Sequence, residues 1–365
     1  MSLSIGIVGL PNVGKSTLFN ALTQKSVPAE NYPFCTIDPS VGVVPVPDER
    51  LHKLSTFSKS ADTLPAVVEF TDIAGLVKGA SEGEGLGNQF LSHVREVDAI
   101  AQMVRIFDDS SVIHVEGRID PLADIEIINL ELILADQHTV LKRSDSIAKD
   151  AKRGDKDAAA LKEVLERITP VLADGKLVSS LEFNEEEQKL VKTLNLLTSK
   201  PFMYILNKKS GAENLDILKD DRWKALMDFF NTTNAIYTTV DARIEGELNE
   251  LEGEDREMFK QELAAHDDGT DELIKKGYEL LDLITYFTTG EKETRAWTVK
   301  RNSTAPQAGR AIHSDFEQKF IRADIIFWEE LLESGSYGVA REKGKVRTEG
   351  REYIVKDGDV IQFKV

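Results

Sequence analysis

The stretch SIGIVGLPNVGKSTLFNAL, residues 4–22, decides the fold of this 365-residue chain. Residues 4–8 form a short apolar run that predicts a buried first strand, and Gly9-x4-Gly14-Lys15-Ser16 then opens a helical pattern. Strand, glycine-rich loop and helix in this order are typical of a P-loop, in which backbone N–H groups and the helix N-terminus hold phosphates. The predicted phosphate-binding residues are Asn12, Val13, Gly14, Lys15, Ser16 and Thr17.

Within this loop the side chains have separate predicted roles. We expect Lys15 to contact the β- and γ-phosphates during catalysis and Ser16 to bind Mg²⁺. Asn12 is a candidate ligand for a monovalent cation, K⁺, that would add positive charge near the phosphates. The Pro- and Gly-rich stretch NYPFCTIDPSVGVVPVPD (31–48) follows, and its Thr36 is our candidate for a second Mg²⁺ ligand. A plain connecting loop is the alternative for this stretch.

A second motif lies in AVVEFTDIAGLVKGASEGEGLGNQF (66–90), where an apolar strand runs into Asp72-x-x-Gly75. Asp72 is predicted to hold Mg²⁺ through a water, and the Gly75 N–H to sense the γ-phosphate as part of catalysis. In Ras-like enzymes a Gln follows this motif and orients the attacking water, but here the next residue is Leu76. Our candidate for positioning the water is His114, with His93 as the rival.

These segments, together with AIHSDFEQKFIRADII (311–326), resemble the YchF group (Obg-like ATPases) of the Obg-related P-loop translation-factor GTPases. The resemblance extends over nearly the whole chain. It implies a nucleotide-binding domain with a helical insertion and a C-terminal TGS domain of the β-grasp type. It also implies a preference for ATP over GTP, slow hydrolysis and association with the ribosome.

MYILNKKSG (203–211) is similar to the guanine-reading motif Asn-Lys-x-Asp, but Ser210 stands where the Asp belongs. A neutral hydroxyl cannot replace a carboxylate that accepts two hydrogen bonds from guanine. Asn207 is expected to meet the base edge, and the stem of Lys208 to cover the base face. Further along, Asp241-Ala242-Arg243 stands where related proteins carry Ser-Ala-Lys, and the Ala242 N–H is a candidate contact to the base.

The rest of the chain predicts two further parts of an α/β protein with a mostly parallel sheet. Residues 121–200, inside a nucleotide-binding domain of residues 1–281, predict an antiparallel, coiled-coil-like helical pair broken at Gly154. Its apolar stripe is expected at Ile127, Leu130, Ile133 and Leu134 and again at Leu161, Val164, Leu165 and Ile168. Residues 282–365 mix short strands with one helix and predict the β-grasp domain, with a turn at 357–360 before the last strand.

The net charge of −18 is unevenly distributed. Residues 282–365 hold 14 basic and 14 acidic residues, so the excess acid lies in residues 1–281. An acidic body binds nucleic acid poorly, and no DNA partner is expected. The segment 339–356 carries a basic cluster, which is either a solvated loop or a contact to ribosomal RNA: Arg341, Lys343, Lys345, Arg347 and Arg351.

No apolar run is long enough to span a bilayer, and the single Cys35 fits a reducing cytoplasm. The sequence therefore predicts a cytoplasmic, Mg²⁺-dependent NTPase that uses ATP or GTP slowly and binds the ribosome, on its large subunit. Two alternatives remain at this point: a ribosome-binding adaptor with negligible turnover, whose shape the nucleotide tunes, and a true GTPase. A dinucleotide-binding dehydrogenase is excluded, because Lys-Ser-Thr after Gly14 has no place in that motif.

Overall fold

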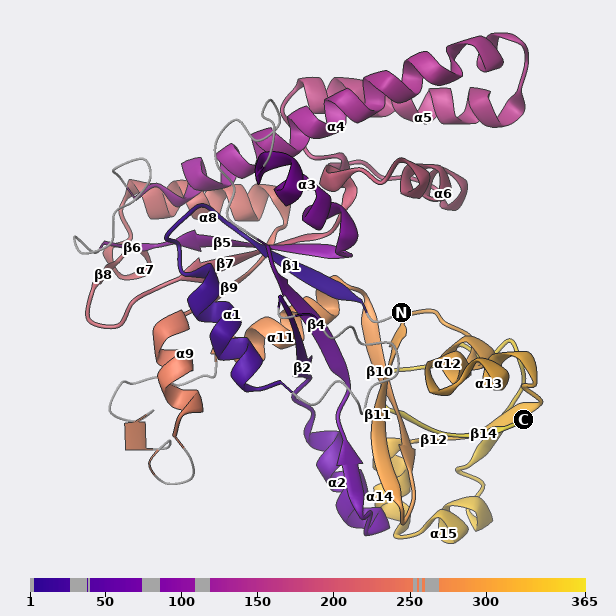
Figure 1. Cartoon of the computed structure of the whole chain (residues 1–365). Coiled ribbons are helices and arrows are strands. Elements are labelled where there is room, and N and C mark those ends of the chain that lie inside the picture. The colour runs from indigo at the N-terminus through magenta and orange to yellow at the C-terminus, as the bar shows by residue number, and fades with distance from the viewer. Residues whose placement is uncertain are drawn as a thin grey trace. The chain divides into compact units, whose positions relative to one another are not determined.

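A computed structural model describes residues 3–26, 38, 40–73, 86–108, 119–251, 255, 258–259 and 269–365 (Figure 1). The chain forms two compact units, one from Met1–Gly42 and Glu69–Leu273 and the other from Val43–Val68 and Ile274–Val365. The expected domains of residues 1–281 and 282–365 stay a prediction; the second compact unit begins at Ile274 and also includes Val43–Val68. Among the described helices, none combines the length and apolar character needed to cross a membrane.

The first unit is built on a sheet with the strand order β2-β4-β1-β5-β7-β9. The central strand β1 (Ser4–Val8) pairs in parallel with β4 (Val67–Asp72) on one side and β5 (Ala99–Arg105) on the other. Two further strands, β7 (Phe202–Asn207) and β9 (Ile236–Val240), continue the parallel set. The carboxyl end of β1 is therefore a topological switch point, where open α/β sheets bind their ligands. The predicted mostly parallel P-loop fold is confirmed.

Other elements surround this sheet or begin in the same unit. They are α1 Lys15–Gln24, β2 Val41–Pro45, α3 Leu86–Glu96, β6 Phe107–Asp108, α6 Glu185–Leu194, β8 Glu213–Asn214, α7 Leu215–Leu218, α8 Asp221–Thr233, α9 Ala242–Asn249 and α11 Gly269–Leu280. The short strands β6 and β8 form a separate antiparallel pair. The 3₁₀ turns Val178–Ser180 and Leu197–Ser199 flank α6.

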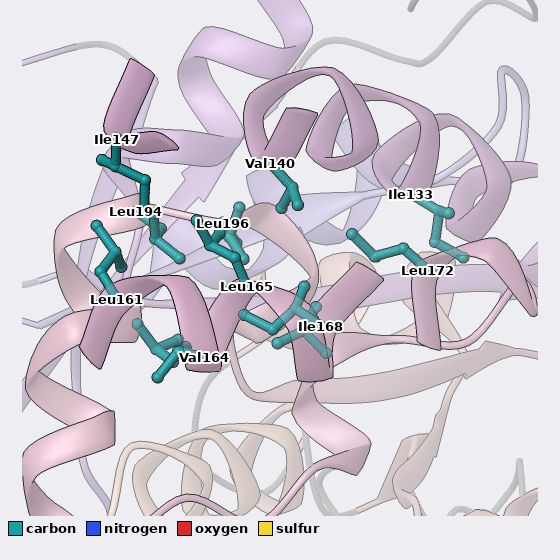
Figure 2. Packing of buried hydrophobic residues seen from close by; sticks show 12 residues of the cluster. Ile133, Val140, Ile147, Leu161, Val164, Leu165, Ile168, Leu172, Leu194 and Leu196 are labelled. Atoms are coloured by element: carbon teal, nitrogen blue, oxygen red, sulfur yellow. The ribbon is translucent and has the colours of Figure 1, made fainter. Parts of the chain in front are cut away.

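Two long helices, α4 (Pro121–Lys152) and α5 (Lys156–Ala173), form the predicted antiparallel pair (Figure 1). Gly154 turns the chain between them with a φ of 88°, and Asp155 caps α5 by accepting the Ala158 N–H at 2.8 Å. Figure 2 shows the apolar core that joins the helices to the segment after them. The core residues are Ile133, Val140, Ile147, Leu161, Val164, Leu165, Ile168, Leu172, Val178, Val191, Leu194 and Leu196.

The apolar stripe at the start of α4 was predicted wrongly. Leu130 is 53% exposed and Ile127 is half-buried, whereas Ile125 and Ile128 are buried. The reason is that this part of α4 does not pack on α5. Ile125 belongs instead to a core cluster with Val104 of β5 and other residues of the sheet layer. The buried face therefore changes along the helix as its neighbour changes.

Asp136 connects the middle of α4 to the chain just before β7 through hydrogen bonds. Its fully buried carboxylate accepts hydrogen bonds from the Leu197 N–H at 3.0 Å, the Thr198 N–H at 2.8 Å and the Thr198 hydroxyl at 2.7 Å. Burial raises the pKa of the Asp136 carboxyl, and these hydrogen bonds oppose the shift. The helical insertion is thereby tied to the strand that ends at Asn207.

The second unit contains a mixed sheet with the strand order β13-β12-β14-β10-β11-β3. A hairpin, one main helix and a second antiparallel pair give the predicted β-grasp arrangement, with β10 and β14 parallel at the centre. Its elements are α2 Glu49–Ser58, β3 Asp62–Leu64, β10 Leu283–Thr289, β11 Glu293–Lys300, α12 Ala305–Ile312, α13 Ser314–Gln318, β12 Arg322–Phe327, α14 Trp328–Ser334, α15 Tyr337–Glu342, β13 Arg347–Glu349 and β14 Asp359–Lys364. The turn before the last strand is confirmed at Gly358, which has a φ of 88°.

Local contacts explain why residues 43–68 belong to this unit. The strand β3 pairs in parallel with β11, and Asp62 lies opposite Glu293. Arg50 of α2 forms ion pairs with Asp48 at 2.7 Å and with Asp357 at 2.5 Å. Sequence patterns do not reveal the pairing of β3 with β11 or of Arg50 with Asp357, because these partners lie more than 200 residues apart.

Candidate nucleotide-binding site

At Gly9 and Gly14 the backbone of the P-loop passes so close to neighbouring atoms that only glycine fits. Gly14 is the N-cap of α1 and has a φ of 102°, and a Cβ there would overlap the Asn207 amide nitrogen. A Cβ on Gly9 would lie 2.6 Å from the Met103 carbonyl oxygen of β5. Glycine accepts both the left-handed conformation and the close approach. The loop is thus closely packed between β1, β5 and β7.

Lys15 is held across this loop. Its side chain is 8% exposed, and its Nζ donates to the carbonyl oxygens of Gly9 at 2.9 Å and Leu10 at 2.8 Å. Burial lowers the pKa of the Lys15 ammonium, while the negative charge of Asp72 opposes the shift. An ammonium group has three N–H donors, so one remains for a phosphate oxygen. The predicted role of Lys15 at the phosphates stays a prediction.

Ser16 and Asp72 lie together at the ends of α1 and β4. The Ser16 hydroxyl lies near enough to the Asp72 carboxylate to influence its pKa. Burial raises the pKa of the Asp72 carboxyl, while the charge of Lys15 and the Ser16 hydroxyl lower it. Asp72 Oδ1 is buried without a hydrogen-bond partner within the described part of the chain.

This oxygen pair fits Mg²⁺. The ion prefers hydroxyl and carboxylate oxygens and commonly takes its other ligands from phosphates and water. Within the described part of the chain, no group of three His, Cys, Asp or Glu side chains could hold a metal ion by itself. Ser16 and Asp72 would hold the ion against bound phosphates.

Asn207 joins three loops at the carboxyl edge of the sheet. Its side chain is buried, and its Nδ2 donates to the Val13 carbonyl oxygen at 2.8 Å. Its Oδ1 accepts the Ala242 N–H at 3.2 Å. The P-loop, the loop after β7 and the start of α9 are therefore connected through one side-chain amide. The bridging role was not predicted from the sequence, which assigned Asn207 to the base edge alone.

The residues of the predicted base site have different surroundings. Lys208 is exposed, and its backbone N–H donates to Val240 O at 2.9 Å. Ser210 is also exposed, and its N–H donates to Asp241 Oδ2 at 2.6 Å. The Ala242 N–H, predicted to touch the base, has Asn207 as its partner within the protein.

Other predicted residues divide into two groups. Asn12 and Thr17 are exposed on the P-loop and the first turn of α1, and Asn12 has a φ of 65°. His93 is half-buried on α3. Thr36, Gly75 and His114 lie outside the described residues, so their predicted roles stay predictions.

Asp241 is a site residue to which the sequence analysis gave no role. It is 7% exposed and caps α9, accepting the N–H groups of Arg243 at 3.2 Å and Ile244 at 3.1 Å. An Asp directly after a strand and before a helical segment is a recognisable N-cap signal. Its bond to Ser210 depends on the alignment of β7 with β9, which sequence patterns do not give.

Comparison with known proteins shows the family of this chain. A family model described as "50S ribosome-binding GTPase" matches residues 4–143, and a model of the C-terminal part of YchF GTPases, described as a protein of unknown function, matches residues 283–365. The "Ribosome-binding ATPase YchF" of Bacillus subtilis is 54% identical over 364 residues, covering 100% of this chain and 99% of that protein. The chain belongs to the YchF family.

Other YchF proteins give the same result. The one from Escherichia coli O157:H7 is 49% identical, with the same coverage of both chains. The solved structure of the Schizosaccharomyces pombe YchF GTPase matches with a TM-score of 0.87 at 36% identity, covering 100% of this chain and 98% of that one. The similarity to the YchF group that the motifs indicated is thus confirmed over both units of the chain.

We expect Lys15→Ala and Ser16→Ala each to abolish measurable binding of Mg²⁺-nucleotide. Lys15→Ala removes the ammonium that we expect to bind the phosphates, and Ser16→Ala removes the hydroxyl near Asp72 that we expect to bind Mg²⁺. Isothermal titration with Mg²⁺ and a nonhydrolysable ATP analogue measures both. Lys192→Ala, which changes an exposed residue of α6, is the control and should bind as the wild type does. Micromolar affinity in both P-loop variants would show that this loop is not the phosphate site.

Proposed function

We propose that this chain is an Mg²⁺-dependent nucleoside triphosphatase that takes ATP at least as readily as GTP, and that it binds the ribosome. The observation that carries the base preference is the surroundings of Ser210. This residue stands at the carboxylate position of Asn-Lys-x-Asp, and its N–H is bonded to Asp241 at 2.6 Å. The name that the Bacillus subtilis and Escherichia coli relatives carry, Ribosome-binding ATPase, supports both parts of the proposal.

The loss of preference for guanine that follows from the missing carboxylate can be estimated. Each hydrogen bond from guanine to a charged acceptor contributes about 1.5–3 kcal/mol. Loss of two such bonds removes roughly 3–6 kcal/mol, or about two to four powers of ten in preference for guanine. Adenine presents no N1–H or 2-amino group, so its binding leaves no donor unpaired at Ser210. ATP therefore keeps its affinity while GTP loses its advantage.

The phosphate side of the site has conventional roles for its residues. Lys15 would bind the β- and γ-phosphates, and the Gly75 N–H would contact the γ-phosphate. Ser16, Asp72 and Thr36 would hold Mg²⁺, which when bound supplies charge neutralisation for the phosphate oxygens. K⁺ near Asn12 is a further proposed cation.

The chemical step lacks the usual water-orienting Gln, because Leu76 occupies its place and cannot hydrogen-bond a water. We propose slow turnover for that reason. His114 remains our candidate for positioning the water and His93 its rival. Positioning of this kind contributes about 10²–10⁴-fold in rate.

Direct comparison of the two nucleotides tests the proposal. We expect ATP to bind at least as tightly as GTP, measured side by side by isothermal titration in the presence of Mg²⁺. A hundredfold tighter binding of GTP would contradict the assignment of Ser210 and favour a true GTPase. Phosphate release, measured with and without ribosomes, should be slow but above that of Lys15→Ala. Release equal to that variant in both conditions would favour the adaptor alternative.

For the ribosome, we propose contact through residues 282–365 with the RNA of the large subunit, in the cytoplasm. Support comes from the charge distribution and the basic cluster of residues 339–356. Two residues of the cluster already form ion pairs within the protein: Arg341 pairs with Asp324 at 2.8 Å and Lys345 with Glu333 at 3.3 Å. Arg341 therefore also stabilises this unit, because Asp324 is 7% exposed.

Neutralising basic residues of the cluster while leaving Arg341 intact tests the proposed contact. The triple variant Lys343→Gln, Lys345→Gln and Arg347→Gln should pellet with large ribosomal subunits less than the wild type does. Sedimentation through a sucrose cushion at two salt concentrations measures this, and the deficit should shrink at the higher salt because the wild type has more salt-sensitive phosphate contacts to lose.

A matched variant controls for the loss of three charges. Lys292→Gln, Lys300→Gln and Lys319→Gln remove the same charge from exposed positions of the same unit, outside the cluster. We expect this variant to pellet as the wild type does. Equal pelleting of both triple variants and the wild type would exclude the cluster as the ribosome contact.

A further inference from the structure

The base site contains a carboxylate, but it belongs to the loop opposite Ser210. Strands β7 and β9 pair in parallel with Asn207 opposite Val240, so the loops that follow them leave the sheet side by side (Figure 1). In this alignment Ser210 meets Asp241. Compared with the usual Asp in Asn-Lys-x-Asp and Ser in Ser-Ala-Lys, the two residue types have changed places.

The geometry leaves this carboxylate little capacity to read a base. Asp241 Oδ2 accepts the Ser210 N–H at 2.6 Å, and Oδ1 accepts the N–H groups of Arg243 and Ile244. The side chain is 7% exposed, so both oxygens are engaged inside the protein. The N-terminus of α9 also stabilises the negative charge where it is.

The loop that carries Ser210 is fixed from its other side as well. Asn214 accepts the Lys209 N–H at 2.9 Å and donates to the carbonyl oxygens of Lys209 at 2.9 Å and Ala212 at 3.1 Å. Gly211 takes the left-handed conformation that the turn needs, with a φ of 75°. Ser210 cannot move away from Asp241 without breaking this turn.

We propose that Asp241 is a specificity-determining residue of the base site, and that it acts together with Ser210. The buried, negatively charged carboxylate of Asp241 accepts the Ser210 N–H and so holds the loop after β7. Its charge disfavours a second carboxylate at position 210. The site thereby keeps a neutral group next to the base and admits adenine. This inference rests on the proposed function, in that it assumes the base of a nucleoside triphosphate lies at Ser210.

Substitutions at positions 210 and 241 should therefore have non-additive effects on guanine recognition. Ser210→Asp alone would place a second negative charge next to the buried one, so the new carboxylate would be repelled or protonated and would read guanine poorly. Asp241→Ser alone keeps an N-cap hydroxyl for α9 but leaves no carboxylate at the base. In the double variant the hydroxyl at 241 can donate to the carboxylate at 210, and nothing repels it. Only the exchange of both residues should create guanine reading.

The experiment is a double-mutant cycle in the full-length chain. Affinities for Mg²⁺-ATP and Mg²⁺-GTP are measured by titration for the wild type, Ser210→Asp, Asp241→Ser and the double variant. We expect the double variant to raise the ratio of GTP to ATP affinity about a hundredfold or more over the wild type, in line with two recovered charged hydrogen bonds. Each single variant should change that ratio less than about tenfold.

The outcomes distinguish the proposed function from the proposed role of Asp241 in specificity. A wild type that binds neither nucleotide would contradict the proposed function itself. If the wild type binds ATP but Ser210→Asp alone gives the full gain in GTP affinity, Asp241 plays no part in specificity. The same conclusion follows if the double variant still binds ATP without any gain for GTP. Ser210→Asp with Asp241→Asn retains an acceptor for the α9 cap, and its gain in GTP affinity shows whether removal of the charge is sufficient even if the Ser exchange disturbs folding.

Discussion

The arrangement of the nucleotide site depends on the buried side-chain amide of Asn207. It donates to the Val13 carbonyl oxygen in the P-loop and accepts the N–H of Ala242 at the start of α9. These partners come from loops after β1 and β9, and Asn207 itself ends β7. The contact is possible only because Gly14 has no Cβ to occupy the same space. One amide thus fixes the phosphate loop and the base loops relative to each other.

Parallel strands bring these groups together, because their carboxyl ends share one edge of the sheet. Asp72 reaches the same edge from β4 and lies against Ser16, where burial raises its pKa. The helical insertion is linked to the other end of β7 through Asp136, which holds the chain just before that strand. The insertion and the nucleotide site therefore share a strand as a common support.

Much of this could be predicted from the sequence, since the P-loop chemistry is local. Glycines, Lys15 and Ser16 occur within eight residues, and their roles follow from their order. The start of α4 was mispredicted because helical spacing does not tell which neighbour a helix packs on. The pairing of β3 with β11 and the bond between Ser210 and Asp241 could not be predicted, because both depend on alignments between distant segments. The bridging role of Asn207 was missed for the same reason.

The most direct test of this account is the binding of Mg²⁺-tripolyphosphate, which has no base, to Asn207→Ala. If Asn207 organises the P-loop, the variant should lose affinity for tripolyphosphate, ATP and GTP alike while its circular dichroism stays that of the wild type. Ser210→Ala, a change at the base loop alone, should bind tripolyphosphate normally. Wild-type affinity of Asn207→Ala for tripolyphosphate, with a loss for nucleotides only, would contradict the account and reduce Asn207 to a reader of the base.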